Sequence, residues 1–105
     1  MTTAFQEKVY QATRRIPAGR TATYSLIAEA IGCRSPRAVG QALRRNPYAP
    51  EVPCHRVISS DGSLGGFHGE TAGHQIARKR QLLKQEGVTF RSDGVIAPDC
   101  ILPRL

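Results

Sequence analysis

The sequence lacks the features that define several common protein classes. Its three cysteines, Cys33, Cys54 and Cys100, are an odd number without CxxC spacing, which argues against a disulfide framework or a zinc knuckle. No apolar run approaches the roughly 18 residues that span a bilayer. The first residues contain neither the charged segment nor the apolar segment of a signal peptide. We therefore expect a cytoplasmic protein in a reducing compartment, with no membrane association and no bound metal.

Acidic residues are also scarce. The chain has 8 aspartate and glutamate residues against 15 lysine and arginine residues, so its formal net charge is +7 and its pI is near 10.0. Such a balance favours a polyanionic partner, most simply a nucleic acid, with an acidic membrane surface as the lesser alternative.

The length and the apolar spacing predict one mainly helical domain. A chain of 105 residues holds one modest core, and we find no repeat or linker that would divide it. Helices are expected over residues 3–15, 23–31, 35–45 and 71–86, and the 91–105 tail is uninformative. Thr2 or Thr3, Thr23 and Ser35 are the candidate N-caps, and Pro36 fits the first position of its helix. In the fourth helix Ile76, Leu82 and Leu83 form the apolar set, and Arg78, Lys79, Arg80 and Lys84 the polar set.

Two short hairpins are expected beside these helices. Residues 56–59 and 64–67 resemble strands around the turn signal of residues 60–63. Residues 88–90 and 95–96 flank a second turn signal at 91–94 and could form a wing. The predicted fold is therefore a mainly α, winged helix-turn-helix-like single domain with short β-hairpins.

The helices at 23–31 and 35–45 suggest a helix-turn-helix. On the second of them Arg37, Gln41, Arg44 and Arg45 share one outward face, with no acidic residue among them. Gly40 weakens the helix but leaves a flat spot that a phosphate backbone could approach. A solvated helix face is the plainer interpretation, but the helix-turn-helix context favours DNA contact.

The segment Val52-Pro53-Cys54-His55-Arg56-Val57 carries the chemistry. Pro53 restricts its own backbone and that of Val52, and the β-branched Val57 and Ile58 favour a strand. Cys54 is therefore expected on a stiff bend at the start of a strand. A buried structural cysteine is the usual alternative. A reactive thiol needs a base or a positive neighbour, and that base needs an orienting group. His55 is the adjacent base, and Glu86 is one candidate to orient it.

The Pro53-Cys54-His55-Arg56-Val57 segment resembles the active-site motif of the O6-alkylguanine-DNA alkyltransferases. Other segments are similar to this family in the same order along residues 4 to 90. They are Thr23-Tyr24-Ser25-Leu26-Ile27-Ala28, Arg37-Ala38-Val39-Gly40, Arg45-Asn46-Pro47 and Leu82-Leu83-Lys84-Gln85-Glu86-Gly87.

The resemblance implies a single-use repair protein, which flips O6-alkylguanine out of duplex DNA. Cys54 would then take the alkyl group irreversibly, His55 would deprotonate Cys54 through a water, and Glu86 would orient His55. Tyr24 would assist flipping and donate a proton to the leaving base, and Asn46 would brace the active-site turn.

The same resemblance implies the binding surfaces. Arg37 would fill the space that the flipped base leaves in the duplex. The partner is expected to be double-stranded DNA containing O6-alkylguanine, and the protein a monomer without a cofactor. DNA contacts are expected at Arg37, Gly40, Gln41, Arg44, Arg45, Thr23 and Ser35, the pocket floor at Val52 and Pro53, and its lid at Phe67, His68 and Gly69.

The sequence departs from the family in the lid and in its extent. Phe67 and His68 stand where many members have tyrosine and serine, and residues 69–75 form a longer stretch than usual. We also expect the protein to lack the family's common N-terminal domain. The alternative function is an alkyltransferase-like sensor that binds alkylguanine without transfer, although such proteins usually replace the cysteine. A plain helix-turn-helix regulator leaves the Cys-His-Arg segment unexplained, and a cysteine hydrolase would need an oxyanion hole that nothing here signals.

Overall fold

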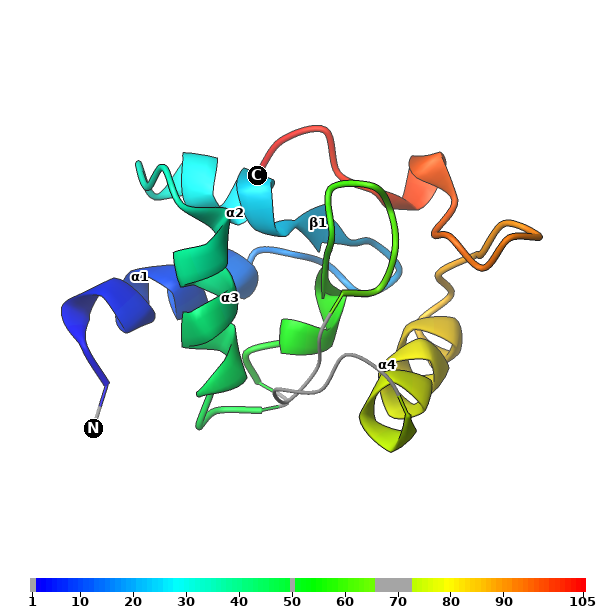
Figure 1. The fold of residues 1–105 in the computed structure, drawn as a ribbon, viewed down its shortest axis with the longest axis horizontal. Helices are drawn as coiled ribbons and strands as arrows, with labels where there is room; N and C mark the ends of the chain where they lie inside the picture. The colour runs from blue at the N-terminus through cyan, green and yellow to red at the C-terminus, as the bar shows by residue number, and fades with distance from the viewer. Residues whose placement is uncertain (1, 50, 66–72) are drawn as a thin grey trace.

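The structure is a computed structural model that describes residues 2–49, 51–65 and 73–105. A cluster of three helices and a separate fourth helix lie on either side of a minimal sheet (Figure 1). The helices are α1 (Ala4–Thr13), α2 (Tyr24–Ala30), α3 (Pro36–Arg44) and α4 (His74–Gln85). The strands are β1 (Ala22–Thr23) and β2 (Val57–Ile58), and the 3₁₀ turns are η1 (Cys54–Arg56) and η2 (Pro98–Cys100). The prediction of a mainly helical domain is confirmed.

The first three helices begin where the sequence predicts. Thr3 caps α1 in a capping box with Gln6, and the hydroxyls of Thr23 and Ser35 accept the backbone N–H groups of Leu26 and Ala38, each at 3.1 Å. Pro36 occupies the first turn of α3. These caps satisfy amide groups that have no acceptor within their own helix.

The three N-terminal helices share one core. Val9, Ile27 and Val39, one from each helix, are all completely buried. Tyr10 is also completely buried, and its hydroxyl donates to the carbonyl of Ala42 at 2.7 Å, which joins α1 to α3. The buried faces of α2 and α3 leave the opposite side of α3 exposed, as a helix-turn-helix requires.

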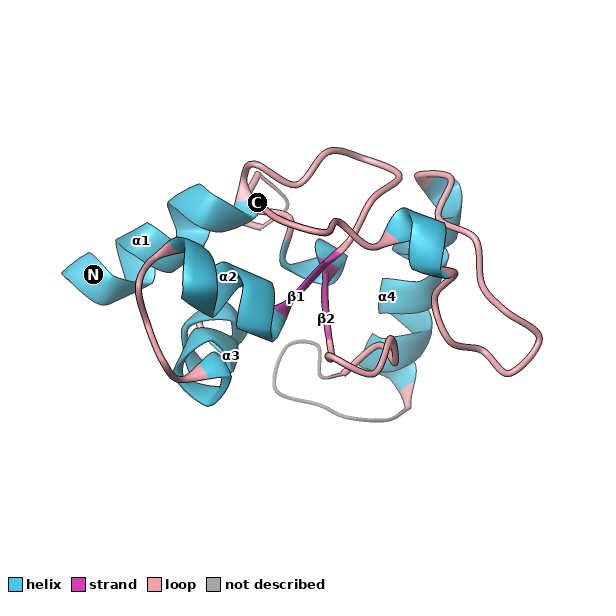
Figure 2. Cartoon of the chain, turned by 90° about the horizontal axis from the view of Figure 1, so that it is seen from above, coloured by secondary structure: helices cyan, strands magenta, loops and turns pink. Residues whose placement is uncertain are grey.

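The strands pair differently from the prediction. β2 pairs in parallel with β1, with Ala22 opposite Val57 and Thr23 opposite Ile58, rather than with Leu64 and Gly65 as a hairpin (Figure 2). The turn at 59–63 does form, since the Ser59 amide donates to the Ser63 carbonyl at 3.0 Å. Leu64 and Gly65 nevertheless have no strand structure, and residues 66 and 67 lie outside the described residues. The parallel pair brings the start of α2 beside the segment that follows Cys54.

The C-terminal residues form a second core with α4. Ile58, Leu83 and Ile96 are buried together there. The hairpin expected around residues 91–94 is reduced to one antiparallel bridge between Phe90 and Ile96. The tail, which the sequence left undefined, runs beside β1: Ile101 forms a parallel bridge with Thr21.

Candidate active site

Cys54 lies on a tight turn immediately before β2, as predicted. Its amide donates to the carbonyl of Val52 at 2.8 Å across Pro53, whose φ of −80° and ψ of 69° define an inverse γ-turn. The 3₁₀ turn η1 follows and leads directly into Val57. Val52 and Pro53 are both buried. The backbone therefore holds the thiol through two consecutive turns rather than through an extended segment.

Asn46 braces this turn from the end of α3. Its side-chain amide donates to the Val52 carbonyl at 3.0 Å, and its carbonyl oxygen accepts the Tyr48 amide at 2.9 Å. One side chain thus joins both ends of the loop that carries Cys54.

His55 and Arg56 converge on one carboxylate. His55 Nε2 lies 3.0 Å from Glu86 Oε2, while Arg56 Nε and Nη2 donate to the two oxygens of Glu86 at 2.9 and 2.7 Å (Glu86 lies just beyond α4). Arg56 Nη1 also donates to the Ile16 carbonyl at 2.7 Å, beyond the end of α1. Because an ionised carboxylate only accepts hydrogen bonds, the proton of neutral His55 is on Nε2, and Nδ1 keeps its lone pair.

The pKa values of two side chains of this cluster, His55 and Glu86, are lowered from their usual ranges. Burial lowers the pKa of His55 although Glu86 acts to raise it, so the imidazole is neutral near pH 7. Burial by itself would raise the pKa of Glu86, but hydrogen bonds from Arg56 and His55 outweigh it and the pKa is lowered. The cluster therefore consists of a neutral base, an ionised carboxylate and a guanidinium that neutralises it.

Cys54 is 7% exposed, and burial raises the pKa of its thiol. Hydrogen bonds from the Asn46 side chain and from the backbone of Cys54 and His55 act in the opposite direction, as does the positive charge of Lys79. The thiol is therefore mostly protonated at neutral pH, and these groups favour its ionised form.

Lys79 was missed as a site residue. The sequence placed it only in the polar set of the fourth helix, but it is completely buried, and its ammonium donates to the carbonyls of Val57 and Leu64 at 2.7 and 2.5 Å. Its spacing from Ile76 and Leu83 places it on the inward face of the helix, a signal that the sequence contained. The sequence identified Arg56 only as a member of the motif. No signal in the neighbouring residues predicted its pairing with Glu86.

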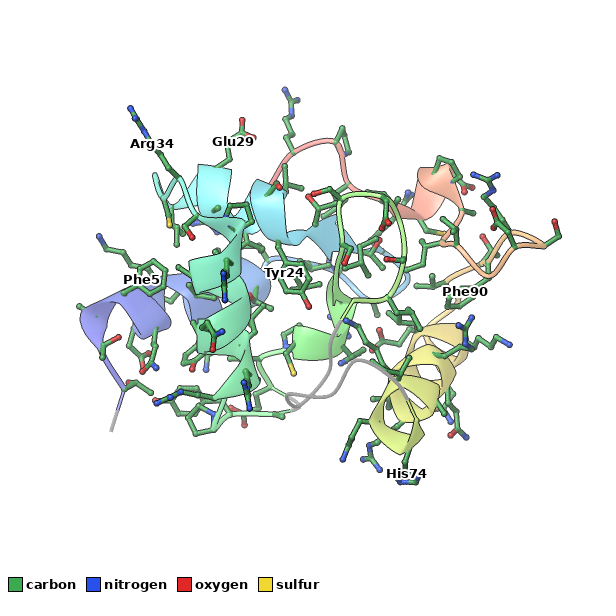
Figure 3. The ribbon with its side chains drawn as sticks, viewed as in Figure 1. Phe5, Tyr24, Glu29, Arg34, His74 and Phe90 are labelled. Atoms are coloured by element: carbon green, nitrogen blue, oxygen red, sulfur yellow. The ribbon has the colours of Figure 1, made fainter. Side chains whose placement is uncertain are left out.

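Tyr24 is held between two glycines at the start of α2. A Cβ on Gly40 of α3 would lie 3.9 Å from the tyrosine ring, and one on Gly65 would lie 3.1 Å from it. Gly65 also has a φ of +69°, a conformation that favours glycine. The Tyr24 side chain points from α2 into the space between α3 and the loop after β2 (Figure 3).

The outward face predicted for the third helix is exposed. Arg37, Gln41, Arg44 and Arg45 are all solvent-exposed on α3 or at its end. Thr23 and Ser35 use their hydroxyls as helix caps. The expected lid residues Phe67, His68 and Gly69 lie outside the described residues.

Two classes of site receive no support from the part of the chain that the structure describes. In residues 2–49, 51–65 and 73–105 no three histidine, cysteine or acidic side chains gather as metal ligands. No helix within the same residues is long and apolar enough to cross a membrane.

The fold and the site together define a helix-turn-helix domain that presents a buried cysteine beside a His-Glu-Arg cluster. Residues 4–88 match the family described as the DNA-binding domain of 6-O-methylguanine DNA methyltransferase. The chain belongs to this family.

Individual relatives give the same result. The chain is 44% identical over 88 residues to the methylated-DNA–protein-cysteine methyltransferase of Methanothermobacter thermautotrophicus, covering 84% of this chain and 47% of the relative. It is 46% identical over 80 residues to a DNA base-flipping protein of Thermus thermophilus, covering 76% of this chain and 50% of the relative. The chain thus spans about half the length of the curated relatives it matches.

Two kinds of solved structure resemble the fold. Mycobacterium tuberculosis OGT in complex with DNA has a TM-score of 0.73 and 45% identity, covering 83% of this chain and 52% of that one. S. pombe Atl1 in complex with damaged DNA containing O6-carboxymethylguanine has a TM-score of 0.77 and 32% identity, covering 97% of this chain and 98% of that one. The resemblance to Atl1 therefore extends over nearly the full length of both chains.

Proposed function

We propose that this chain repairs DNA by moving the alkyl group of O6-alkylguanine irreversibly onto its own Cys54. The observation that carries the proposal is the turn that fixes Cys54 next to His55, with His55 Nε2 bonded to Glu86 at 3.0 Å. That arrangement supplies a nucleophile, a base with a free ring nitrogen and a group that orients the base. The site lies on a helix-turn-helix domain whose exposed helix is cationic, which supports a nucleic-acid substrate.

DNA binding is assigned to the exposed face of α3. Arg44 and Arg45 are proposed to contact phosphates along the duplex, together with Gln41 on the same exposed face. Arg37 is near the N-terminus of α3 and is proposed to enter the stack in place of the flipped base. Gly40 allows close approach beside Tyr24, and Thr23 and Ser35 begin the two helices at the same surface.

The proposed transfer is one displacement. His55 Nδ1 takes the proton of Cys54 through a water, and the thiolate sulfur attacks the alkyl carbon. As the new S–C bond forms, the bond between that carbon and O6 breaks, and the electron pair leaves with guanine. The Tyr24 hydroxyl donates a proton to the departing base. The product is a thioether, and the described site has no group placed to hydrolyse it, so each molecule acts once.

The pocket is proposed to form between the Cys54 turn and the lid. Val52 and Pro53 would supply its floor, Asn46 would keep the turn in place, and Phe67, His68 and Gly69 would close it. We further propose that the protein acts as a monomer in the cytoplasm and needs no metal or cofactor.

A mass measurement tests this function. The protein is incubated with duplex DNA that contains one O6-methylguanine, and its intact mass and peptide map are then recorded. We expect one added methyl group on Cys54, the same result for the Cys33→Ser and Cys100→Ser controls, and no added mass for Cys54→Ser. Methylation at another residue would contradict the assignment of Cys54.

A second candidate is a sensor that binds alkylated DNA without transfer. The near-complete coverage of Atl1, which was solved with damaged DNA, favours it. The retained Cys54 and its His55–Glu86 pair favour transfer. Tight binding to the methylated duplex with unchanged protein mass would support the sensor.

A further inference from the structure

The backbone of Tyr48 holds together the loop between α3 and η1. Its amide donates to the side-chain oxygen of Asn46 at 2.9 Å, and its carbonyl accepts the amide of Val52 at 3.0 Å. The described residues of this loop belong to no helix or strand, so these bonds satisfy backbone groups that have no regular partner. Tyr48 therefore connects the beginning of the loop to the residue two positions before Cys54.

The side chain of Tyr48 is anchored on α1. Its hydroxyl donates to Glu7 Oε2 at 3.0 Å, and its ring lies edge-on to that of Tyr10, with centroids 5.6 Å apart and an interplanar angle of 86°. The guanidinium carbon of Arg14 lies 5.6 Å from the centre of the Tyr48 ring. Tyr10 is completely buried and bonded to the carbonyl of Ala42, so the tyrosine pair rests on the core of the three N-terminal helices.

Val52 links this anchor to the nucleophile. Its amide is bonded to Tyr48, and its carbonyl accepts the amide of Cys54 at 2.8 Å as well as the side-chain amide of Asn46 at 3.0 Å. A shift of Tyr48 would therefore move Val52 and rotate the turn that directs the Cys54 thiol. Displacement at carbon requires the reacting atoms to be aligned at about 3–3.5 Å, and a misplacement of about 1 Å can cost about 100-fold in rate.

We propose that Tyr48 is a positioning residue for alkyl transfer, which fixes the direction of the Cys54 thiol by anchoring its loop to α1. Asn46 holds the two ends of the loop together, whereas Tyr48 holds the loop against α1, so the two residues restrain different motions. The link to catalysis rests on the proposed function, but the anchoring of the loop does not.

Amide hydrogen exchange measures the anchoring without DNA. NMR follows the amides of Val52 and Cys54 in the unmodified protein and in Tyr48→Ala, each relative to the amide of the buried core residue Ile27. A general loss of stability speeds all three amides, so we expect a specific loosening of the loop to raise the two ratios by at least about ten-fold. The control Thr13→Val loses a buried hydroxyl that donates to a carbonyl within α1 at 2.8 Å, and it should leave both ratios unchanged. Unchanged ratios in Tyr48→Ala would overturn the proposal.

Single-turnover methylation measures the consequence for transfer. The rate constant is recorded against the concentration of duplex DNA that contains O6-methylguanine. At saturating DNA, Tyr48→Ala should react at least about ten-fold more slowly, while the half-saturating concentration changes by less than about two-fold because the exposed face of α3 is intact. Tyr48→Phe keeps the ring and should have an intermediate rate. An unchanged rate in Tyr48→Ala, or an equal loss in Thr13→Val, would overturn the role in transfer.

Tyr48→Phe also covers the case in which Tyr48→Ala does not fold. It removes only the hydroxyl that bonds to Glu7, so the loop amides should still exchange about three-fold faster relative to Ile27, and identical exchange would overturn the anchoring. If the amides respond as expected but Cys54 of the unmodified protein gains no methyl from damaged DNA, the proposed function fails and the anchoring stands. If Cys54 gains a methyl but the Tyr48 variants change neither exchange nor rate, only the role of Tyr48 is lost.

Discussion

Replacing Glu86 by glutamine should separate the two roles of its carboxylate. Glutamine keeps the shape but removes the charge that accepts two hydrogen bonds from Arg56 and one from His55. The side chains of Arg56 and Glu86 are only 18% and 20% exposed, so the pair is shielded from solvent screening. A hydrogen bond to a charged group contributes about 1.5–3 kcal/mol, and glutamine retains one acceptor, so we expect a loss of about 2–3 kcal/mol in the free energy of unfolding.

Thermal and urea denaturation measure this loss. For a domain of this size it corresponds to a fall in melting temperature of about 10 °C. The matched control Glu29→Gln lies on the outer side of α2, away from the site (Figure 3), and should stay within about 0.5 kcal/mol of the unmodified protein. Because the stabilising pair needs ionised Glu86, whose pKa is lowered, its contribution is present above the usual glutamate range and is lost as the pH falls through the folded-state pKa.

The transfer rate completes the test. Glu86→Gln should also slow methylation of Cys54 by at least about ten-fold, because the single acceptor of glutamine cannot serve both Arg56 and His55 and the charge that stabilises protonated His55 is removed. Arg56→Met should reproduce much of the stability loss, and a double-mutant cycle of the two changes should give a coupling of at least about 1 kcal/mol. A Glu86→Gln protein with unchanged stability, or with unchanged transfer, would refute the corresponding role.

Three further predictions follow from the same geometry. Arg37→Ala should reduce base flipping, measured with a fluorescent base beside the lesion, more than it reduces plain duplex binding. Arg44→Ala should instead weaken binding to damaged and undamaged DNA alike. Equal losses of flipping and binding in Arg37→Ala would refute its role in the stack. Asn46→Ala should lower stability in urea by about 1–3 kcal/mol because the Val52 carbonyl loses one of its two donors and the Tyr48 amide loses its side-chain acceptor, and no loss would contradict the bracing role. Because the pKa of Lys79 is lowered to about 7 in the folded protein, the unfolded chain binds one more proton than the folded protein above that pH. The free energy of unfolding, compared with that of Lys79→Met, should therefore rise from about pH 7 to 9 by up to about 1.4 kcal/mol per pH unit. Parallel plots of stability against pH for the two proteins would show that Lys79 titrates normally.

The helix starts were predictable because their signals are local. The Thr23 and Ser35 caps and the Pro36 start depend on residues within a few positions of each other, and all form as expected. The bend at Cys54 is also local, since Pro53 restricts the backbone there.

Strand pairing was not predictable in the same way. Val57 and Ile58 have the β-branched character of a strand, and the turn signal after them favoured a hairpin partner. The partner is instead Ala22–Thr23, about 35 residues earlier in the chain. No short-range pattern specifies such a contact.

The site residues also divide into those that local sequence signals predict and those that depend on distant packing. Cys54 and His55 were identifiable from the Pro53-Cys54-His55-Arg56-Val57 motif, Asn46 from the segment Arg45-Asn46-Pro47, and Glu86 from the segment that precedes Gly87. Lys79 appeared as one member of a cationic run, and its burial depends on how α4 packs against η1 and β2. Its spacing from apolar neighbours was informative, but its charge grouped it with the other basic residues of the helix, because lysine is rarely buried.

The central claim is that one sulfur atom accepts one alkyl group and keeps it. The most direct test uses duplex DNA carrying an isotopically labelled O6-methyl group in excess over protein, with the label counted in both molecules over time. The account predicts one labelled methyl per protein molecule, located on Cys54, and an equal number of guanines restored, with no further reaction. Loss of label from DNA without its appearance on Cys54, or binding of damaged DNA with no transfer of label, would contradict it.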